Sequence, residues 1–196
     1  YASVSFTHKN TDISVREKLS FSNIERKNEI LRLISSSQNI NECMVLSTCN
    51  RVEIIASVKT VEGASKHIIA CMSLICGIPF EELQSRADVY EDNGAVHHLF
   101  AVASSLDSLV IGETQIAGQL KEAYKFARAN GKCGAKLGRA MEFAFKCAAE
   151  VRNKTEISKN PISVSSVAVA KAKEIFGTLN GMVAVIVGAG EMAELA

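Results

Sequence analysis

The sequence lacks an excess of charge of either sign, since 22 lysine and arginine residues stand against 21 aspartate and glutamate residues. A free-standing nucleic-acid-binding protein usually carries a visible basic excess. The balance therefore disfavours a protein whose only task is to bind RNA or DNA, although it allows chemistry on one end of a nucleic acid. The hydrophobic content of 47% is typical of a globular protein with a real core.

The chain also lacks a signal peptide and a long apolar run, so we expect no membrane span. None of its six cysteines stands in a CxxC pair, and their spacing is irregular. This pattern disfavours zinc fingers, iron–sulfur sites and disulfide-rich secreted scaffolds. It favours a reducing compartment and predicts no metal site.

The first half of the chain predicts a strand–helix–strand–strand–helix–strand order. Apolar and β-branched runs mark the strands, and apolar residues at helical spacing mark the helices. The expected strands are Ser3–Thr7, Cys43–Ser47, Val52–Val58 and Ala87–Glu91. The expected helices are Ser22–Ser36, with a capping box at Ser22, and Val61–Cys76, ended by Gly77. This order predicts an α+β domain of the ferredoxin-like type.

The second half predicts added helices and then a change of fold class. Helices are expected from Asn93, over Ile116–Ala129, over Lys136–Glu156 and from Ser163 to Phe176. The continuous apolar run Met182–Val187 then predicts a strand buried on both faces, as in a parallel sheet.

A glycine-rich turn follows this strand directly. Gly188 and Gly190 allow a tight turn and close approach of a pyrophosphate to a helix N-terminus, which predicts the start of an α/β Rossmann domain. The expected cofactor-binding residues are Gly188, Ala189, Gly190, Glu191 and Met192. The residue that would distinguish NAD from NADP lies beyond Ala196. We therefore expect a catalytic domain (1–156), a connecting helix region (157–180) and a truncated Rossmann domain (181–196).

Cys49 is the first candidate for chemistry. The other cysteines in predicted strands and helices occupy positions where a small core residue would serve. Cys49 instead lies in a polar turn between Thr48 and Asn50, where burial as a hydrophobic residue makes little sense. A nearby guanidinium such as that of Arg51 would raise the thiolate fraction, or could instead bind a substrate carboxylate.

Two further groups have both a functional and a structural interpretation. His97 and His98 stand together at the start of a predicted helix, where one can face a cleft while the other is structural. In the glycine-containing stretch after Asp107, Ser108 and Gln115 can reach a polar ligand. On spacing alone, that stretch is better explained as the first turn of a helix with solvated polar residues.

These residues together resemble the glutamyl-tRNA reductase family. The resemblance lies in Leu46–Glu53 (Leu-Ser-Thr-Cys-Asn-Arg-Val-Glu), Val96–Phe100, Ser105–Ile116 and Val187–Met192. It extends over essentially the whole chain, with the blocks in the order of the family. The combination is far more specific than any single block.

The resemblance implies a mechanism and a set of roles. The Cys49 thiolate would take glutamate from glutamyl-tRNA(Glu) as a thioester, and NADPH would reduce the thioester to glutamate-1-semialdehyde, the first committed step of tetrapyrrole synthesis. The implied catalytic residues are Cys49 and His98, the latter near the reacting carbonyl. The implied substrate-binding residues are Thr48, Asn50, Arg51, Ser108, Glu113 and Gln115.

The resemblance also implies partners and a location. The family forms homodimers through a C-terminal domain that would lie outside this chain. The cysteine content and the run Lys132–Lys136 look like plant members, which implies a plastid stroma location, a removed transit peptide, chlorophyll synthesis and a plastid regulatory binding protein.

Two other functions stay open from the residues alone. A different cysteine-dependent dehydrogenase with a thioester intermediate would share the thiol and the glycine-rich turn. A regulatory thiol module would bind a partner without turnover.

Overall fold

The computed structural model describes residues 1–157, 164–185 and 187. Its centre is a four-stranded sheet formed by β1 (Ala2–Thr7), β2 (Ile40–Ser47), β3 (Arg51–Val58) and β4 (Asp88–Glu91). The strand order is β2-β3-β1-β4, and every neighbouring pair is antiparallel. This is the arrangement of a ferredoxin-like fold, so the predicted α+β class is confirmed.

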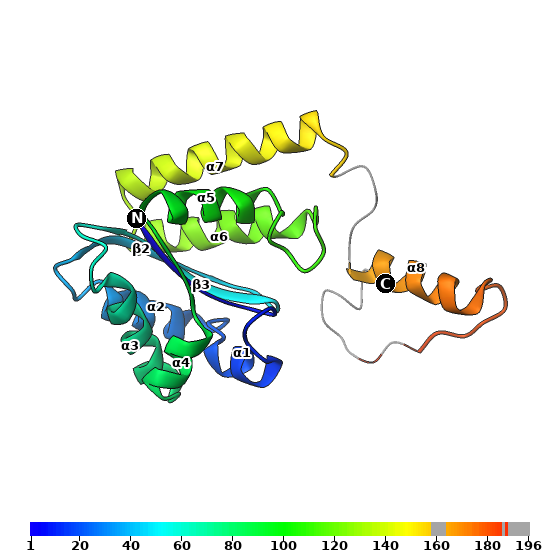
Figure 1. The fold of residues 1–196 in the computed structure, drawn as a ribbon, viewed down its shortest axis with the longest axis horizontal. Helices are drawn as coiled ribbons and strands as arrows, with labels where there is room; N and C mark the ends of the chain where they lie inside the picture. The colour runs from blue at the N-terminus through cyan, green and yellow to red at the C-terminus, as the bar shows by residue number, and fades with distance from the viewer. Residues whose placement is uncertain (158–163, 186, 188–196) are drawn as a thin grey trace.

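Helices cover both faces of the sheet (Figure 1). One face carries α1 (Ile13–Leu19), α2 (Ile24–Ile34), α3 (Ala64–Cys76) and α4 (Phe80–Arg86). The opposite face carries α5 (Asp92–Ala103), α6 (Gln115–Ala129) and α7 (Ala135–Lys154). The last helix of the described chain is α8 (Val164–Phe176).

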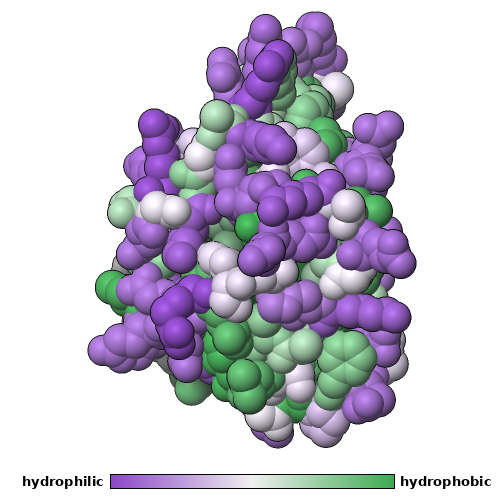
Figure 2. Space-filling view, turned by 90° about the vertical axis from the view of Figure 1, so that its left-hand side faces the viewer, coloured by the Kyte–Doolittle hydropathy of each residue, from purple (hydrophilic) through white to green (hydrophobic). Residues whose placement is uncertain are grey.

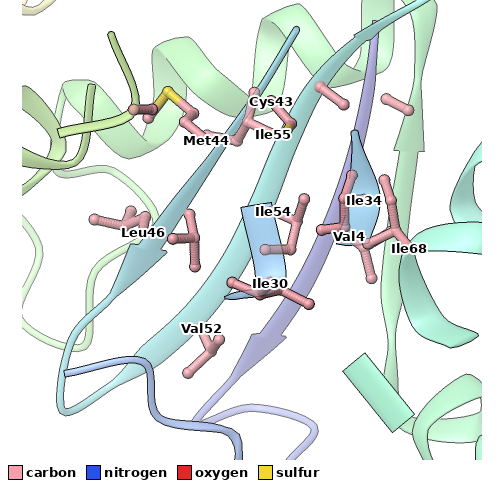
Figure 3. Close-up of a cluster of buried hydrophobic side chains, with 14 of the residues drawn as sticks. Val4, Ile30, Ile34, Cys43, Met44, Leu46, Val52, Ile54, Ile55 and Ile68 are labelled. Carbon is pink, nitrogen blue, oxygen red and sulfur yellow. The ribbon is translucent and has the colours of Figure 1, made fainter. Parts of the chain in front are cut away.

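The face toward α2 and α3 is the apolar core. Val4 and Ile54 come from the two central strands and lie with Ile34 and Ile68 from the helices (Figure 3). All four side chains are completely buried. Burial of each such side chain contributes about 1.5–3 kcal/mol, so this layer supplies much of the stability of the domain.

The face toward α5 is buried but polar. Residues alternate between the two faces of a strand, and in β1 the alternate residues Ser3, Ser5 and Thr7 point away from the apolar core. They are at most 3% exposed, as are Arg51 and Glu53 of β3. A helix over this face closes it from solvent, and the polar groups must therefore find partners within the protein.

The start of α7 is anchored to the sheet edge by a carboxylate. Glu42 of β2 accepts hydrogen bonds from the backbone nitrogens of Lys136 (3.0 Å) and Leu137 (2.7 Å). A Cβ at Gly134 would lie 2.9 Å from Glu42 Oε1, so glycine leaves the space that this approach needs. The arrangement satisfies backbone donors that a helix N-terminus leaves free.

Three details differ from the sequence-based expectation. The cap of α2 is Asn23 rather than Ser22, since the Asn23 side chain accepts from the backbone nitrogens of the two residues that follow Ile24. The short helix α1 was not predicted. Residues 182–185 and 187 form no strand, and Val183 and Val187 are exposed, because no strand of the described chain lies beside them to pair with.

No helix among the described residues is both long enough and apolar enough to cross a membrane. On the side of the molecule seen in Figure 2, hydrophilic side chains cover most of the surface, and hydrophobic ones gather toward its lower end.

Candidate active site at the β2–β3 turn

Cys49 stands exposed at the tip of the hairpin between β2 and β3. The turn is fixed by Thr48, whose backbone nitrogen donates to the carbonyl of Arg51 at 2.8 Å. The Thr48 hydroxyl oxygen also accepts from the backbone nitrogens of Asn50 (3.2 Å) and Arg51 (3.1 Å). A side-chain oxygen that binds backbone donors in this way holds a tight turn, so the thiol projects from a defined support.

The hairpin tip is also attached to the end of β1. The backbone nitrogen of His8 donates to the carbonyl of Asn50 at 3.1 Å, and Thr7 pairs with Arg51 in the sheet. The backbone of Asn50, one of the predicted substrate-binding residues, thus holds the loop in place. Two contacts therefore attach the tip to β1 and the segment that follows it.

A buried carboxylate lies directly below the hairpin. Glu53 of β3 is completely buried, and its Oε1 accepts from Ser3 Oγ (2.9 Å) and lies 2.6 Å from His98 Nε2. Its Oε2 accepts from Ser5 Oγ (3.4 Å) and from Arg51 Nη1 (3.1 Å). Burial alone would raise the pKa of Glu53, but the charge and hydrogen bond of His98, the charge of Arg51 and the Ser3 hydroxyl lower it overall.

His98 reaches this carboxylate from α5 and is itself buried. Its ring stacks on Tyr90 of β4, with the centroids 3.9 Å apart and the planes 8° from parallel. The sequence-based picture placed His98 beside the reacting carbonyl. The structure places its Nε2 on Glu53 inside the protein, because α5 covers the polar face of the sheet.

Arg51, which the sequence predicted to bind a substrate carboxylate, is paired with carboxylates of the chain itself. Its side chain is 3% exposed and donates through Nη1 to Glu53 and through Nη2 to Asp107 Oδ2 at 2.9 Å. The Asp107 backbone carbonyl accepts from Nη2 as well. Lys9 Nζ lies 2.5 Å from the other carboxylate oxygen of Asp107. Burial would raise the pKa of Asp107, but the hydrogen bonds and charges of Lys9 and Arg51 lower it overall.

Asp107 belongs to the connection between α5 and α6. Hydrogen bonds between the two ends of this connection close it into a compact loop. Ser105 has a left-handed backbone (φ 61°), its hydroxyl donates to the carbonyl of Glu113 at 2.5 Å, and its carbonyl accepts from the nitrogen of Gly112 at 2.9 Å. The predicted residue Ser108 is 8% exposed, and its hydroxyl has no hydrogen-bond partner among the described residues. Glu113 contributes its backbone here rather than its side chain.

Gln115, the remaining predicted substrate-binding residue, begins α6 and faces a groove of about 610 Å³. The groove lies along the β2 edge of the sheet, between α2 and α6, and includes Ser47, the last residue of β2 before the hairpin tip. It therefore opens beside the turn that carries Cys49. The other lining residues are Ile24, Lys27, Val45, Leu46, Gly118, Gln119, Glu122, Ala123 and Phe126.

Sequence reasoning missed four residues of this site: Lys9, Glu53, Tyr90 and Asp107. One signal was available, because Glu53 is a carboxylate between the apolar residues Val52 and Ile54, and such a residue in a buried strand usually has a partner. The predicted cofactor-binding residues Gly188–Met192 lie outside the described residues.

Comparisons of the sequence and of the fold with known proteins find relatives of a single family. The sequence profile described as "Glutamyl-tRNAGlu reductase, N-terminal domain" matches residues 4–155. The glutamyl-tRNA reductases of Campylobacter concisus (strain 13826) and Campylobacter fetus subsp. fetus (strain 82-40) are 67% and 66% identical to it over 196 residues. Both matches cover 100% of this chain and 46% of the relative, so the chain spans about half the length of these relatives.

A solved structure is also similar. The glutamyl-tRNA reductase from Methanopyrus kandleri superposes with a TM-score of 0.67 at 30% sequence identity, and the match covers 97% of this chain and 44% of that chain. At this level of identity the match supports a common family as well as a common fold.

The expectation of a plastid location is wrong, and the expected transit peptide and role in chlorophyll synthesis are not supported. The relatives at 60–67% identity come from Campylobacter species, which are bacteria and have no plastids. The cysteine of the run that looked plant-like has a packing role instead. This residue, Cys133, is buried and donates to the carbonyl of Cys43 at 3.5 Å.

Proposed function

The chain belongs to the glutamyl-tRNA reductase family, and we propose that it supplies the part of this enzyme in which Cys49 takes the glutamyl group from glutamyl-tRNA(Glu). The complete reaction would be the NADPH-dependent reduction of that group to glutamate-1-semialdehyde, with release of the tRNA, at the start of tetrapyrrole synthesis. The observation that carries the proposal is the exposed thiol of Cys49 on a turn held by Thr48.

The first chemical step is an acyl transfer. The Cys49 sulfur forms a bond to the carbonyl carbon of the ester, and the bond from that carbon to the ribose oxygen breaks. The ribose oxygen takes up a proton and leaves with the tRNA, while glutamate stays on the enzyme as a thioester. A thioester accepts a hydride more readily than an ester, so the cysteine divides one difficult reduction into two easier steps.

The surrounding residues of this chain position the thiol. Thr48 holds the backbone of the turn, and the pairing of β1 with β3 fixes its base. Glu53 holds both Arg51 and His98. Because His98 is 5% exposed, its contact with Glu53 supports a role in orienting Glu53 and Arg51 rather than direct contact with the reacting carbonyl.

NADPH would supply the hydride for the second step. We propose that residues 1–156 form the catalytic domain, that 157–180 connect it to the next domain, and that 181–196 begin the NADPH-binding domain. Because the chain spans 46% of its Campylobacter concisus relative, the rest of such a protein would complete the cofactor site and form the homodimer.

The experiment that tests this function is intact-mass spectrometry of the protein after mixing with glutamyl-tRNA(Glu) in the absence of NADPH. We expect a glutamyl adduct that maps to the peptide containing Cys49, and no adduct for Cys49→Ser. The matched control is Cys147→Ser, which removes a half-buried thiol of α7 and should leave the adduct unchanged. An adduct on another cysteine, or one that persists in Cys49→Ser, would refute the assignment.

A further inference from the structure

We propose that α6 and α7 form a basic surface that holds the phosphate backbone of the tRNA acceptor arm, with Arg128 and Arg139 as its central contacts. The inference rests on the proposed function, in which the ester at the end of the acceptor arm must reach Cys49. The thiol stands on a tight turn held by Thr48, which offers little surface to a nucleic acid. Another part of the protein must therefore hold the tRNA.

The near-neutral charge of the chain conceals a strong separation of charge along it. Residues 115–154, which span α6, α7 and the turn between them, hold nine lysine and arginine residues but three aspartate and glutamate residues, a net charge of +6. The other residues hold thirteen basic and eighteen acidic side chains, a net charge of −5. A surface of one sign attracts and orients a partner of the opposite sign.

Most of the basic side chains on these helices are exposed and unpaired. Lys125 and Lys154 each pair with a glutamate of their own helix, Glu122 and Glu150. The other seven form no ion pair with a carboxylate in the described part of the chain. Their charge is therefore free to interact with a large anion from solution.

Two of the unpaired arginines line one groove of about 640 Å³ between the helices, Arg128 from α6 and Arg139 from α7. The Arg139 guanidinium lies over the ring of Phe143, 5.8 Å from its centroid, which orients the cation without neutralising it. Among the described residues that line the groove, the one acidic residue is Glu142. Arginine binds phosphate through two parallel hydrogen bonds, so this pair suits a ribose-phosphate backbone.

The basic surface continues into a second hollow. Arg139 also lines this hollow, which has a volume of about 500 Å³, together with Lys136 and Tyr1. The two hollows adjoin, because Ala135 and Arg139 line both of them. A phosphate backbone presents its charges at short, regular intervals, so cations in adjoining hollows can contact successive phosphates.

The surface is connected to the candidate active site by α6. This helix begins at Gln115, which lines the groove that opens beside the turn carrying Cys49. Arg128 follows Gln115 by thirteen residues in the same helix, which corresponds to about 20 Å along its axis. The acceptor arm is the part of the tRNA that lies this close to the ester, so it is the arm that α6 and α7 would contact.

The first experiment measures binding of uncharged tRNA(Glu) to the complete protein by fluorescence anisotropy over a range of salt concentrations. We expect Arg128→Gln combined with Arg139→Gln to raise the Kd about tenfold, because two contacts with phosphates are lost. The slope of log Kd against log salt should fall by about two, since fewer counterions are released on binding.

The matched control also removes two exposed cations. It combines Arg32→Gln with Lys66→Gln, on α2 and α3, which cover the opposite face of the sheet (Figure 1). We expect its Kd and salt slope to match those of the wild type. An equal loss of affinity in the control would overturn the proposal, because the effect would then come from net charge rather than from this surface.

The second experiment locates the contact. The photoreactive residue p-benzoylphenylalanine is placed at Phe143, which is 47% exposed on α7, and the protein is illuminated with tRNA(Glu). We expect a cross-link to a nucleotide of the acceptor arm. The same residue at Leu74, which is 74% exposed on α3, is the control and should give no cross-link. A cross-link from Phe143 to the anticodon arm alone would refute the placement.

The outcomes distinguish this inference from the proposed function. If the double arginine variant weakens binding and the cross-link maps to the acceptor arm, but no glutamyl adduct forms at Cys49, the tRNA surface stands and the proposed reaction fails. If the adduct forms while the double variant binds tRNA(Glu) as tightly as the wild type, the tRNA surface is refuted. The basic helices would then serve a different anionic partner.

Discussion

The Arg51 guanidinium lies 3.1 Å from Glu53 Oε2, two positions along the same strand, and neither side chain is more than 3% exposed. Residues two apart in a strand point to the same face, so this pair is built into β3. It joins the hairpin that carries Cys49 to the polar layer beneath α5.

Loss of the carboxylate at this pair should destabilise the fold. We expect Glu53→Gln to lower the free energy of unfolding by about 3–5 kcal/mol, because Arg51 would keep its charge in a buried position with one partner fewer. Urea denaturation followed by circular dichroism measures the change. Glu122→Gln, on the exposed face of α6, is the control, and an equal effect of the two substitutions would contradict a special role for the buried pair.

Acid should weaken the fold through the same carboxylates. The pKa values of Glu53 and Asp107 are both lowered in the folded protein from their usual values of 4.5 and 3.8. A carboxyl group with a lowered pKa contributes stability that is complete above its unfolded value and is lost as the pH falls through its folded value. We therefore expect the free energy of unfolding to fall progressively below about pH 4.5.

The Glu53→Gln variant gives the control for this pH dependence. It has no carboxyl group to titrate at that position, so its stability should fall less steeply over the same acid range. Urea titrations at a series of pH values would show the difference in slope. Parallel curves for the wild type and the variant would show that Glu53 does not contribute.

The six cysteines should differ sharply in reactivity. Cys49 is exposed, whereas burial raises the pKa of Cys71 to about 11 and that of Cys133 to about 12. The thiolate is the reactive form, so at neutral pH a small neutral alkylating reagent should modify Cys49 first. Peptide mapping at short times measures this order. Early labelling of Cys71 or Cys133 in the folded protein would contradict the described packing.

The turn should depend on the Thr48 hydroxyl. We expect Thr48→Val to lower the free energy of unfolding by about 1 kcal/mol, because two backbone donors lose their acceptor. Acyl-enzyme formation should slow as well, since the Cys49 thiol would no longer be held in one position. Thr48→Ser restores the oxygen and should restore the rate. If the valine variant reacts as fast as the wild type, the hydroxyl does not position the thiol.

Most of the helices and strands among the described residues could be predicted from the sequence. Apolar and β-branched runs located the strands, and Gly77 ended α3 with the left-handed backbone expected of a helix C-cap. The position of Cys49 in an exposed turn follows from neighbouring polar residues alone. The helix α1 was missed because it has seven residues and buries only Leu19, which is too little for a periodic pattern.

The contacts between residues far apart in the sequence could not be predicted. Arg51 and Asp107 are 56 positions apart, and no pattern in one sequence pairs a strand residue with a loop residue over that distance. Nothing in the sequence indicated that the serines of β1 are covered by α5 and donate to Glu53. Strand alternation shows that two faces differ and leaves open what covers the polar one.

The place of β1 in the sheet has a consequence for how the protein is made. This strand lies between β3 and β4, both of which follow it in the chain. During synthesis one edge of β1 can pair once β3 has left the ribosome, but the other stays unpaired until β4 follows, and such an unpaired edge can recruit strands of other molecules. Because its sheet contacts are distant in sequence, the domain should fold slowly. Nascent chains that stop before Glu91 are the forms most prone to aggregate.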